Sequence, residues 1–462
     1  MSQRYVRFNV HELARVAAEA VGSKACEKYP DGMYNKAFLM TMDDGTEIVA
    51  KIPNPNAGRS HFATASEVAT MEFSLHGGSR ADENPVGAEY IVMEKIQGIQ
   101  LDAVRAEMGI EDRFKIVKAI ARLQKTWMTF SFREYGSLYY TEDLHEYFPR
   151  PLYTNREGVK VMTSRFAIGP STGRGFSDDG RSTVEFDRGP WIYQPTRNKK
   201  LKALECYRAL VKYLLPTGPS TVSPFLWHGD LHIENIFVAS KNHTQIIGII
   251  DWQSTELAPL FEHARLPCFL DYDGPPTVGL ERPRLPDNLA QLDFATQMQA
   301  KALYLRQSLS ALYKPYVHKQ NRRLYSALAF GDTPIHDILI LGRSMLVDGE
   351  AAYLAWVAKL ERSLADLPGI RARETVPFPS KFTNEERAQI ESEYMGSVRD
   401  MEAMRKVKES LGELFPERGI VRSDQYEASR KALQRIRERV IGTYAKSKID
   451  KVKWLESWPF NN

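Results

Sequence analysis

The chain has 462 residues, of which 43% are hydrophobic and 26% are charged. This composition fits a globular protein that is long enough for two or three structural units. The 62 basic and 58 acidic side chains nearly balance, with a formal net charge of +4. The balance argues against a general nucleic-acid or membrane-surface binder, which would concentrate Lys and Arg on one face, although it is compatible with a local basic cleft.

Three cysteines lie far apart and form neither a disulfide framework nor a CxxC metal motif, which predicts a reducing compartment. No apolar run approaches the roughly 20 residues that span a bilayer. The start of the chain is rich in arginine, but Glu12 and Glu19 lie there too, and mitochondrial transit peptides are poor in acids. We therefore expect an ordinary first helix and a cytoplasmic protein, with a mitochondrial location as the alternative.

The first hundred residues predict a small α+β unit. Asp43-Asp44-Gly45 is a turn signal between two strand-length apolar runs, and Asn9 and Gly22 are typical helix-capping residues. The elements expected here are a helix over 9–22, a β-meander over 26–53, a helix over about 64–75 and a buried strand over 88–98.

The rest of the chain is predicted to be mostly helical. The elements expected are helices over 110–133 and 200–215, a strand over 244–252, and helices over 288–313, 335–365, 383–413 and 423–447. Residues 136–193 interrupt this pattern, because they are rich in Gly, Pro, Arg and aromatic residues and lack a clear period. Long irregular segments are uncommon in compact domains unless they have a role, so we treat 136–193 as an insertion.

A polar stretch lies between two apolar runs in "FLWHGDLHIENIFV", residues 225–238. If the apolar flanks are buried, the polar side chains between them face a cleft or need internal partners. The segment after residue 238 can turn, so Asn235 and Asp251 are predicted to lie side by side at the two ends of a hairpin. An amide oxygen and a carboxylate suit Mg²⁺, which also keeps water and phosphate ligands. Asp230 is then placed to orient and deprotonate a hydroxyl.

The spacing D-x-x-x-x-N…D is one that kinase-type phosphotransferases use. "HGDLHIEN" followed by "IIDW" resembles the motif of the aminoglycoside phosphotransferase and choline kinase family. With "IGPSTGR" upstream and "DWQSTELAPLF" downstream, the chain more narrowly resembles the fungal phosphotransferase-enzyme branch, which includes the "altered inheritance of mitochondria" proteins. The resemblance covers most of residues 8–275.

This resemblance implies an α+β, protein-kinase-like bilobal fold, with a small β-rich N-lobe and a large helical C-lobe. The domains expected on this basis are an ATP-binding lobe over 1–97, a catalytic and acceptor-binding lobe over 98–375 that contains the insertion, and a helical C-terminal extension over 376–462.

The resemblance also implies catalytic roles at matched positions. Asp230 would be the catalytic base, while Asn235 and Asp251 would be catalytic residues that bind Mg²⁺. His228 would brace the loop. Two neighbouring polar residues are expected to lie near the site without acting as base or ligand: His232 and Glu234.

An ATP site is expected in the N-lobe. Lys51 lies on the otherwise apolar strand "EIVAKIP", where a lone lysine could simply extend its charged end to solvent. With the downstream motif, the resemblance makes Lys51 the partner of the α- and β-phosphates and Glu67 the carboxylate that holds it. Glu72 lies five residues further, roughly 140° around a helix, so both glutamates cannot point at Lys51.

Two further parts of the nucleotide site are implied. The loop at Gly32 would cover the phosphates, although relatives tend to have two adjacent glycines there and this chain has Met33 after Gly32. The segment "YIVMEKIQG" matches the hinge that holds adenine. Met93 would lie behind the base, and the backbone around Glu94 and Ile96 would hydrogen-bond it.

The function expected is ATP- and Mg²⁺-dependent transfer of the γ-phosphate to a hydroxyl of a small molecule, without a nucleic-acid or membrane partner. The alternatives are an inactive kinase-fold binding or scaffold protein and a kinase acting on protein. Acceptor-pocket candidates in the insertion are Tyr139, Tyr140, Arg165, Arg174 and Trp191. Together with Arg181 and Arg188, its arginines suit an anionic acceptor or the nucleotide. Carboxylates after the hairpin suit a cationic one, and both stay open: Glu256, Glu262, Asp271 and Asp273.

Overall fold

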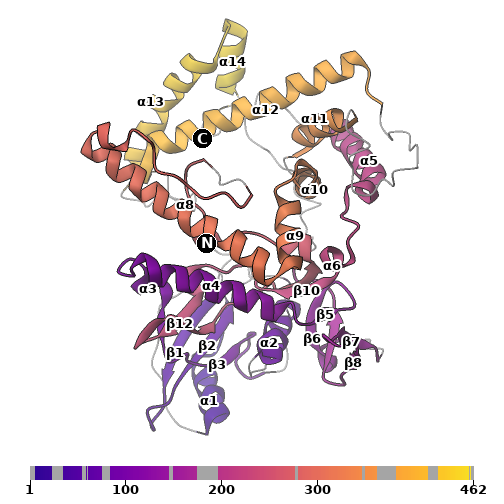
Figure 1. Ribbon diagram of the computed structural model, residues 1–462, viewed down its shortest axis with the longest axis vertical. Helices are drawn as coiled ribbons and strands as arrows, with labels where there is room; N and C mark the ends of the chain where they lie inside the picture. The colour runs from indigo at the N-terminus through magenta and orange to yellow at the C-terminus, as the bar shows by residue number, and fades with distance from the viewer. Residues whose placement is uncertain are drawn as a thin grey trace. The chain divides into compact units, whose positions relative to one another are not determined.

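Figure 1 shows a computed structural model of the protein, in which two compact units are each described by themselves. One unit is built from Met1–Asp179 and Thr217–Asp332, and the other from Gly180–Pro216 and Thr333–Asn462. The structure describes residues 6–22, 35–54, 59, 61–74, 84–144, 149–173, 196–275, 279–345, 349–361, 381–414, 425–456 and 458.

The first unit begins with a small sheet covered by a helix. Its elements are α1 (Val10–Val21), β1 (Asn35–Thr41), β2 (Glu47–Pro53), α2 (Phe62–Ser74) and β3 (Ile91–Glu94). The three strands form an antiparallel sheet in the order β1-β2-β3. The Asn9 side chain caps α1 and Gly22 ends it with a φ of +72°, so the predicted helix is confirmed, as is the meander over its described part.

The side chains of β2 point alternately to the two faces of the sheet, one towards α1 and the other towards α2. Ile48, Ala50 and Ile52 are buried in a cluster with α1 and β1. Because successive residues of a strand point to opposite faces, Lys51 points away from α1. It lies opposite Ala37 and Ile91 in the sheet, and its side chain is directed towards α2.

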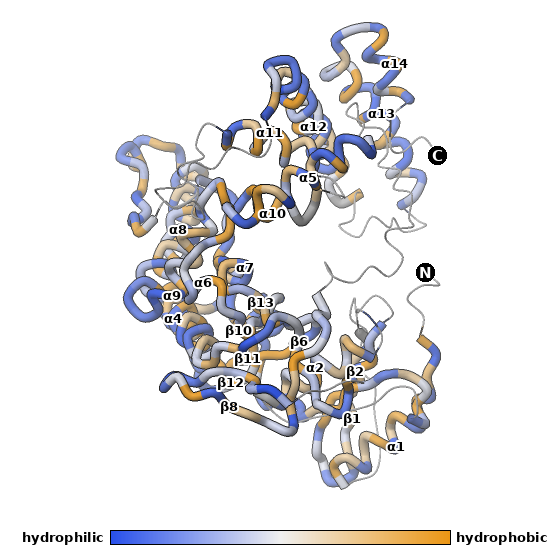
Figure 2. The backbone as a smooth tube through the Cα atoms, turned by 90° about the vertical axis from the view of Figure 1, so that its right-hand side faces the viewer, coloured by the Kyte–Doolittle hydropathy of each residue, from blue (hydrophilic) through white to orange (hydrophobic). Residues whose placement is uncertain are grey.

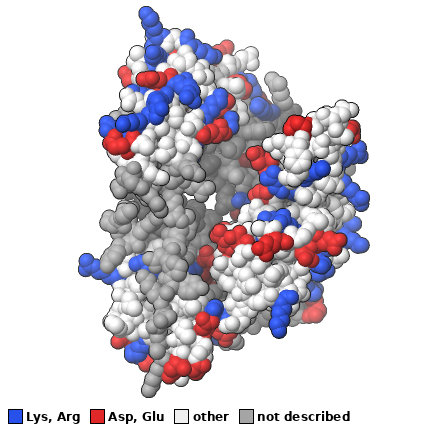
Figure 3. All heavy atoms as spheres, turned by 90° about the vertical axis from the view of Figure 1, so that its left-hand side faces the viewer, with Lys and Arg blue, Asp and Glu red and all other residues white. Residues whose placement is uncertain are grey.

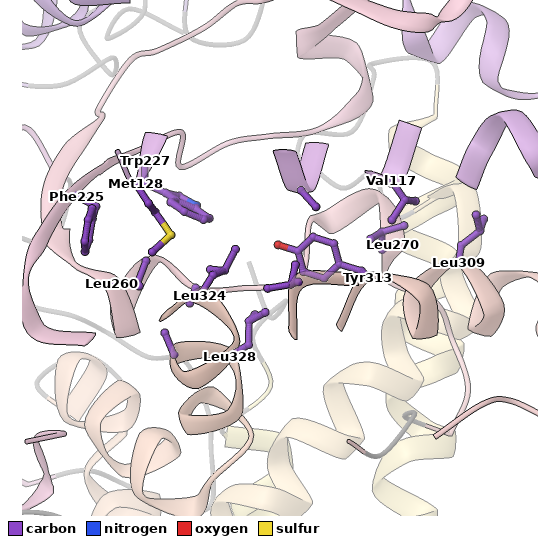
Figure 4. Packing of buried hydrophobic residues seen from close by; sticks show 14 residues of the cluster. Val117, Met128, Phe225, Trp227, Leu260, Leu270, Leu309, Tyr313, Leu324 and Leu328 are labelled. Carbon is purple, nitrogen blue, oxygen red and sulfur yellow. The ribbon is translucent and has the colours of Figure 1, made fainter. Parts of the chain in front are cut away.

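The remainder of the first unit is mostly helical. Its elements are β4 (Ile99–Gln100), α3 (Leu101–Arg105), α4 (Ile110–Trp127), α6 (Pro219–Val222), β10 (Pro224–Trp227), β11 (Ile236–Ala239), β12 (Asn242–Ile249), β13 (Glu256–Pro259), α7 (Leu260–His263), α8 (Phe294–Gln320) and α9 (Arg322–Gly331). Figure 4 shows its core, in which residues of α4, β10, α7, α8 and α9 pack together. Within this core the Tyr313 hydroxyl donates to the side-chain oxygen of Gln124 at 2.5 Å.

The described part of the insertion differs from the irregular segment that the sequence predicts. It contains β6 (Ser137–Tyr140), β7 (Pro151–Thr154), β8 (Lys160–Met162) and β9 (Phe166–Gly169), and β5 (Ser131–Phe132) directly precedes it. β6 pairs with β9, and β7 pairs with β5 and β8. These strands have two to four residues, and β6 is buried at three consecutive positions, so no alternating pattern marks them in the sequence.

The second unit is helical. It contains α5 (Arg197–Leu214), α10 (Pro334–Ser344), α11 (Glu350–Leu360), α12 (Asn384–Leu411), α13 (Tyr426–Tyr444) and α14 (Lys448–Glu456). Two helices, α10 and α11, cover the segment predicted as one helix over 335–365. Figure 2 shows α11 as a largely apolar helix, whereas α12 and α13 alternate between apolar and polar residues, as expected for helices with one solvated face. Among the described residues, no helix is long and apolar enough to cross a membrane.

Candidate active site

The polar stretch after β10 forms the centre of the candidate site. β10 is buried along its whole length and pairs with β13, while β11 pairs with β4 and β12. Residues 228–235 connect β10 to β11 and end in a 3-10 turn over Ile233–Asn235. Because both flanking strands are fixed by pairing and burial, the polar side chains between them are held in defined positions.

The hairpin predicted between Asn235 and Asp251 is confirmed. Ile236 lies opposite Ile249 in the β11–β12 pair, and the backbone nitrogen of Ile250 donates to the carbonyl oxygen of Asn235 at 3.0 Å. Asp251 follows with a φ of +62°, a left-handed backbone conformation that is uncommon for residues other than Gly. Such conformations persist where the surrounding structure imposes them, often at functional sites.

The side chain of Asn235 is oriented by its own loop. It is buried, and its amide nitrogen donates to the backbone oxygen of Asp230 at 3.0 Å and contacts Nε2 of His232 at 3.2 Å. This fixes the amide with its nitrogen turned to the loop, so its carbonyl oxygen is the atom available to a cation. Asparagine and aspartate oxygens are suitable donors for Mg²⁺, and the pair therefore fits that ion.

The described residues contain no cluster of three or more His, Cys, Asp or Glu arranged to hold a metal ion. A cation between Asn235 and Asp251 would therefore draw its other ligands from water and from substrate phosphates. That is the usual coordination of Mg²⁺ in phosphotransferases, where few protein ligands are needed.

Lys51 lies between two carboxylates that come from distant parts of the chain. Its ammonium group is 2.6 Å from the carboxylate of Glu67 on α2 and 2.8 Å from that of Asp251 after β12. The side chains of Lys51 and Glu67 are 9% and 2% exposed, whereas that of Asp251 is 32% exposed. The buried pair thus anchors the lysine, and the more exposed Asp251 is the partner that a ligand can reach.

Burial and charge act in opposite directions on these groups. Burial disfavours the charged form of Lys51, but Glu67 and Asp251 outweigh it and raise the lysine pKa above its ordinary value. Burial raises the pKa of Glu67, and both contributions that lower it come from Lys51. Lys51 therefore stays charged, and it is the group that keeps a buried Glu67 tolerable.

Packing of α2 explains why Glu67 is held so firmly. Arg165 forms an ion pair with Glu72, which keeps that glutamate away from Lys51. The ring of Phe62 meets that of Tyr139 edge-on with centroids 5.9 Å apart. Ala69 of α2 belongs to one buried cluster with residues of β5, the insertion, β10 and β13, namely Phe132, Leu138, Leu152, Leu226 and Leu257.

These contacts also account for the described acceptor-pocket candidates. The buried Tyr139 donates its hydroxyl to the backbone oxygen of Pro170 at 2.7 Å. Tyr140 stacks on Phe166, and the Arg165 guanidinium lies over both rings at 5.7 and 5.6 Å. The other arginines named in the insertion and Trp191 lie outside the described residues.

The nucleotide-site residues of the N-lobe are placed as follows. Met93 and Glu94 lie in β3 opposite Val49 and Ile48 of β2, with Met93 half-buried and Glu94 exposed. Ile96 follows the strand, and its carbonyl oxygen accepts from the nitrogen of Gly98 at 2.9 Å. The predicted phosphate loop with Gly32 and Met33 lies outside the described residues.

His228 connects the loop that contains Asp230 to the end of the strand that leads to Asp251. It is 2% exposed, its Nε2 donates to the carbonyl oxygen of Ile250 at 2.8 Å, and its Nδ1 accepts from the backbone nitrogen of Asp230 at 3.3 Å. Burial lowers its pKa below the ordinary 6.5, which agrees with a neutral ring that donates at one nitrogen and accepts at the other. His228 thus ties the loop with Asp230 to the strand end that leads to Asp251.

This geometry predicts a pH-dependent contribution of His228 to stability. Because the folded pKa is depressed, the contribution is present above pH 6.5 and is lost as the pH falls from there through the folded pKa. Replacement by Asn should lower the free energy of unfolding by about 2 kcal/mol at pH 8. Urea titrations of wild type and His228→Asn should show this difference narrowing below pH 6.5.

A His243→Asn variant on β12 controls for the loss of a histidine as such. A wild-type-minus-variant difference that stays constant from pH 8 to 5, or that His243→Asn reproduces, would contradict the bracing role of His228.

Asp230 is accessible, unlike the groups that hold it. Its side chain is 67% exposed, as is that of Glu234, and His232 lies between them at 3.5 Å from Asp230 and 3.7 Å from Glu234. Because Nε2 of His232 also contacts the amide nitrogen of Asn235, the histidine helps to fix the loop. An acceptor molecule in solution can thus reach the carboxylate of Asp230.

The sequence reasoning assigned no role to Trp252, which the structure places against the histidine brace. Its ring lies 4.7 Å from that of His228, its indole nitrogen donates to the carbonyl oxygen of Ile249 at 3.1 Å, and Trp127 packs on it at 5.6 Å. The sequence does contain a signal for this role, because a large aromatic residue directly follows the predicted metal ligand Asp251. Such a residue indicates that side chains pack behind the site and support it.

A lysine held by a glutamate and an aspartate, beside an Asp-x-x-x-x-Asn loop, defines the class of kinase-like phosphotransferases. Residues 26–264, just over half of the chain, match the phosphotransferase enzyme family, and the chain belongs to this family. Its elements form the small β-rich lobe and large helical lobe of the α+β kinase-like fold, so the predicted fold class is confirmed.

Individual relatives are more distant. A subtelomeric hrmA-associated cluster protein of Aspergillus fumigatus is 26% identical, and the alignment covers 94% of this chain and 96% of that protein. Altered inheritance of mitochondria protein 9, mitochondrial, of Lachancea thermotolerans is 23% identical over 70% of this chain and 61% of that protein.

Among solved structures, amicoumacin kinase in complex with AMP-PNP, Ca²⁺ and its ligand is 13% identical, covers 83% of this chain and 92% of its own, and has a TM-score of 0.33. An ethanolamine kinase of Plasmodium vivax is 9% identical, covers 74% and 84%, and has a TM-score of 0.25. These values are too low to assign a ligand or a reaction to this chain.

Proposed function

We propose that the protein is an ATP- and Mg²⁺-dependent phosphotransferase that moves the γ-phosphate of ATP to a hydroxyl of a small molecule. The observation that carries the proposal is the convergence at Lys51. Glu67 and Asp251 lie within 2.8 Å of it. Asp251 is joined through the β11–β12 hairpin to the loop with Asp230 and Asn235.

The charged groups divide into two roles in this proposal. Lys51, held by Glu67, binds the α- and β-phosphates of ATP. Asn235 and Asp251 hold Mg²⁺, which when bound neutralises negative charge on the β- and γ-phosphates. Asp251 is the lysine's more exposed partner, so it is the carboxylate that can turn to a cation while Glu67 keeps Lys51 in place.

Asp230 acts on the acceptor. Its carboxylate accepts the proton of the acceptor hydroxyl, whose oxygen forms a bond to the γ-phosphorus while the bond from that phosphorus to the β-phosphate oxygen breaks. ADP leaves with the electron pair of that bond, and the proton passes from Asp230 to water. The exposure of Asp230 supports this role, because a catalytic base must lie within hydrogen-bond reach of the proton it takes.

The adenine side is proposed from the sequence match. Met93 would lie behind the base, and the backbone near Glu94 and Ile96 would hydrogen-bond it. The loop at Gly32 would cover the phosphates. Relatives such as the Lachancea thermotolerans protein are named as mitochondrial, which supports a mitochondrial location over the cytoplasmic one. Fractionation of cells that express the tagged protein would decide between the two locations.

Thermal melting with nucleotides tests the proposed function. ATP at a hundred times its dissociation constant should add about 2.7 kcal/mol to stability, which raises Tm by a few degrees in a chain of this size. The shift should need Mg²⁺ and should vanish in Asp251→Ala, which removes a metal ligand. The same samples are then screened for ATP consumption with hydroxyl compounds of either charge.

The absence of a shift with ATP, ADP or GTP in the wild type, with the protein shown to be folded by circular dichroism, would contradict the proposal. It would favour the alternative of a kinase-fold scaffold. Transfer of labelled phosphate to protein and to no small molecule would favour the kinase acting on protein.

A further inference from the structure

The second unit contains a surface hollow that the family match does not reach. It lies between α13 and α14, beyond residues 26–264, and has a volume of about 510 Å³. The residues that line it come from the second half of α13, the connection and α14: Arg437, Glu438, Ile441, Gly442, Ala445, Lys446, Ser447, Lys448, Lys451 and Leu455.

The hollow carries excess positive charge. Four lining residues are basic and one, Glu438, is acidic. Within the part of the chain that the structure describes, Lys446, Lys448 and Lys451 are exposed and form no ion pair with a carboxylate. The nearby Asp450 accepts instead from the backbone nitrogen of Lys446 at 3.0 Å. By contrast, two cations of α12 are paired along their own helix, as Lys406–Glu402 and Arg405–Glu409.

Apolar side chains lie next to this charge on the same helix. Ile449, Val452 and Leu455 of α14 are 72%, 52% and 39% exposed. They are spaced three residues apart, so they share one side of the helix. Figure 3 shows Lys and Arg side chains interspersed with uncharged and acidic ones at the top of the view, the end at which Figure 1 draws α14.

The orientation of α14 is fixed by its opposite side. Trp454 is 4% exposed and belongs to a buried cluster with residues of α12 and α13. Its ring lies 5.8 Å from that of Tyr444. If α14 rotated to bury its exposed aliphatic side chains, Trp454 would leave this core. The aliphatic side chains and the lysines of α14 therefore face outward together.

We propose that the hollow and the exposed side of α14 bind the surface of a membrane rich in anionic phospholipid. Lipid phosphates would enter the basic hollow, and Ile449, Val452 and Leu455 would lie at the boundary of the acyl chains. An exposed apolar face flanked by lysines is the chemistry of helices that lie on membranes without crossing them. Charge complementarity favours an anionic surface, where each lysine strengthens binding.

This proposal differs from the sequence expectation of no membrane partner. The net charge of the whole chain averages out a local cluster. The sequence of α14 does not indicate an amphipathic helix, because the apolar Trp454 lies on the side opposite the exposed aliphatic residues. The proposal is independent of the phosphotransferase reaction, because none of its residues lies in the candidate active site.

Vesicle sedimentation of the full chain tests it. Binding should require phosphatidylglycerol in a phosphatidylcholine vesicle and weaken as salt is added. Lys448→Ala/Lys451→Ala should weaken binding about 25-fold, at about fivefold per lysine. Ile449→Ser/Val452→Ser should weaken it about tenfold by removing apolar contact.

Lys431→Ala is the matched control, since Lys431 is exposed on α13 but does not line the hollow; it should bind vesicles about as well as wild type. Circular dichroism establishes that each variant is folded. Equal binding to neutral and anionic vesicles, or no effect of the double lysine variant, would overturn the proposal. A Tm shift with inorganic phosphate in the absence of vesicle binding would also overturn it, because it would indicate a soluble anion as the ligand. A dimer of the chain that Ile449→Ser/Val452→Ser disrupts would overturn it too, because it would indicate that a second copy covers this surface.

Discussion

Asp230→Asn is expected to reduce turnover by about 10²–10⁴-fold while leaving the binding of MgATP unchanged. Asn has nearly the same size and keeps a polar group at the exposed position, but it cannot accept the acceptor's proton. The Mg²⁺ ligands proposed at Asn235 and Asp251 are untouched, and the backbone contacts of residue 230 to His228 and Asn235 remain possible. Turnover with an identified acceptor and nucleotide-dependent Tm shifts measure the two effects separately.

Glu234→Gln provides a closely matched control for Asp230→Asn. Both carboxylates are 67% exposed, and both flank His232 at similar distances. Each substitution removes one negative charge from the same loop. If loss of local charge alone impaired turnover, the two variants would lose activity equally, and the assignment of Asp230 as the base would fail. The assignment requires Glu234→Gln to retain most of its activity.

Lys51→Met is expected to lower the free energy of unfolding by about 3–5 kcal/mol. The substitution leaves Glu67 buried without its cation, and Asp251 loses a partner as well. Denaturant titrations measure the loss. The double variant Lys51→Met/Glu67→Gln should regain much of the stability, because it has no buried charge at residue 67. It should still fail to bind ATP, because the proposed phosphate-binding lysine is absent.

The pH dependence of Lys51→Met gives a second test. Without Lys51, the contributions that lower the pKa of Glu67 are absent and burial raises it further. A group whose folded pKa is raised contributes stability that is present below its unfolded pKa and is lost as the pH rises through the folded pKa. Lys51→Met should therefore recover part of its stability, relative to wild type, as the pH is lowered towards 4.5.

Arg165→Ala is the control for the removal of any ion pair to α2. The side chain of Arg165 is 58% exposed and that of its partner Glu72 is 7% exposed. Because one of these two charges stays largely in water, the loss of stability is expected to be smaller than for Lys51→Met, in which both partners of the Lys51–Glu67 pair are buried. A Lys51→Met variant no less stable than Arg165→Ala would show that the buried pair does not have the assigned role.

Local sequence patterns predicted the parts of the site that depend on neighbouring residues. The β11–β12 hairpin follows from two apolar runs joined by a polar segment, and α1 follows from its period and its caps. Contacts between distant residues were beyond such patterns. The pair of Lys51 with Asp251 joins residues 200 positions apart, and the pair of Arg165 with Glu72 joins residues 93 apart. Charge alone gave no reason to select these partners from many.

The insertion shows a second limit of sequence reasoning. β6 is short and is buried against α2, and the equally short β9 pairs with β6, so tertiary packing rather than a residue period makes them strands. The same packing placed Tyr139, Tyr140 and Arg165 against α2 or each other. Their residue types had suggested an acceptor pocket, because aromatic and basic side chains occur both in such pockets and in packing contacts within a protein.

The sharing of one core by α2 and the insertion bears on how the protein is switched on. Ala69 is fully buried among residues of β5, β6, β7, β10 and β13, so the helix that carries Glu67 cannot swing outward without opening that core. If the protein has the proposed activity, it would assemble its lysine–glutamate pair once, when it folds. Its control would then operate through synthesis, location or supply of the acceptor, and not through movement of this helix.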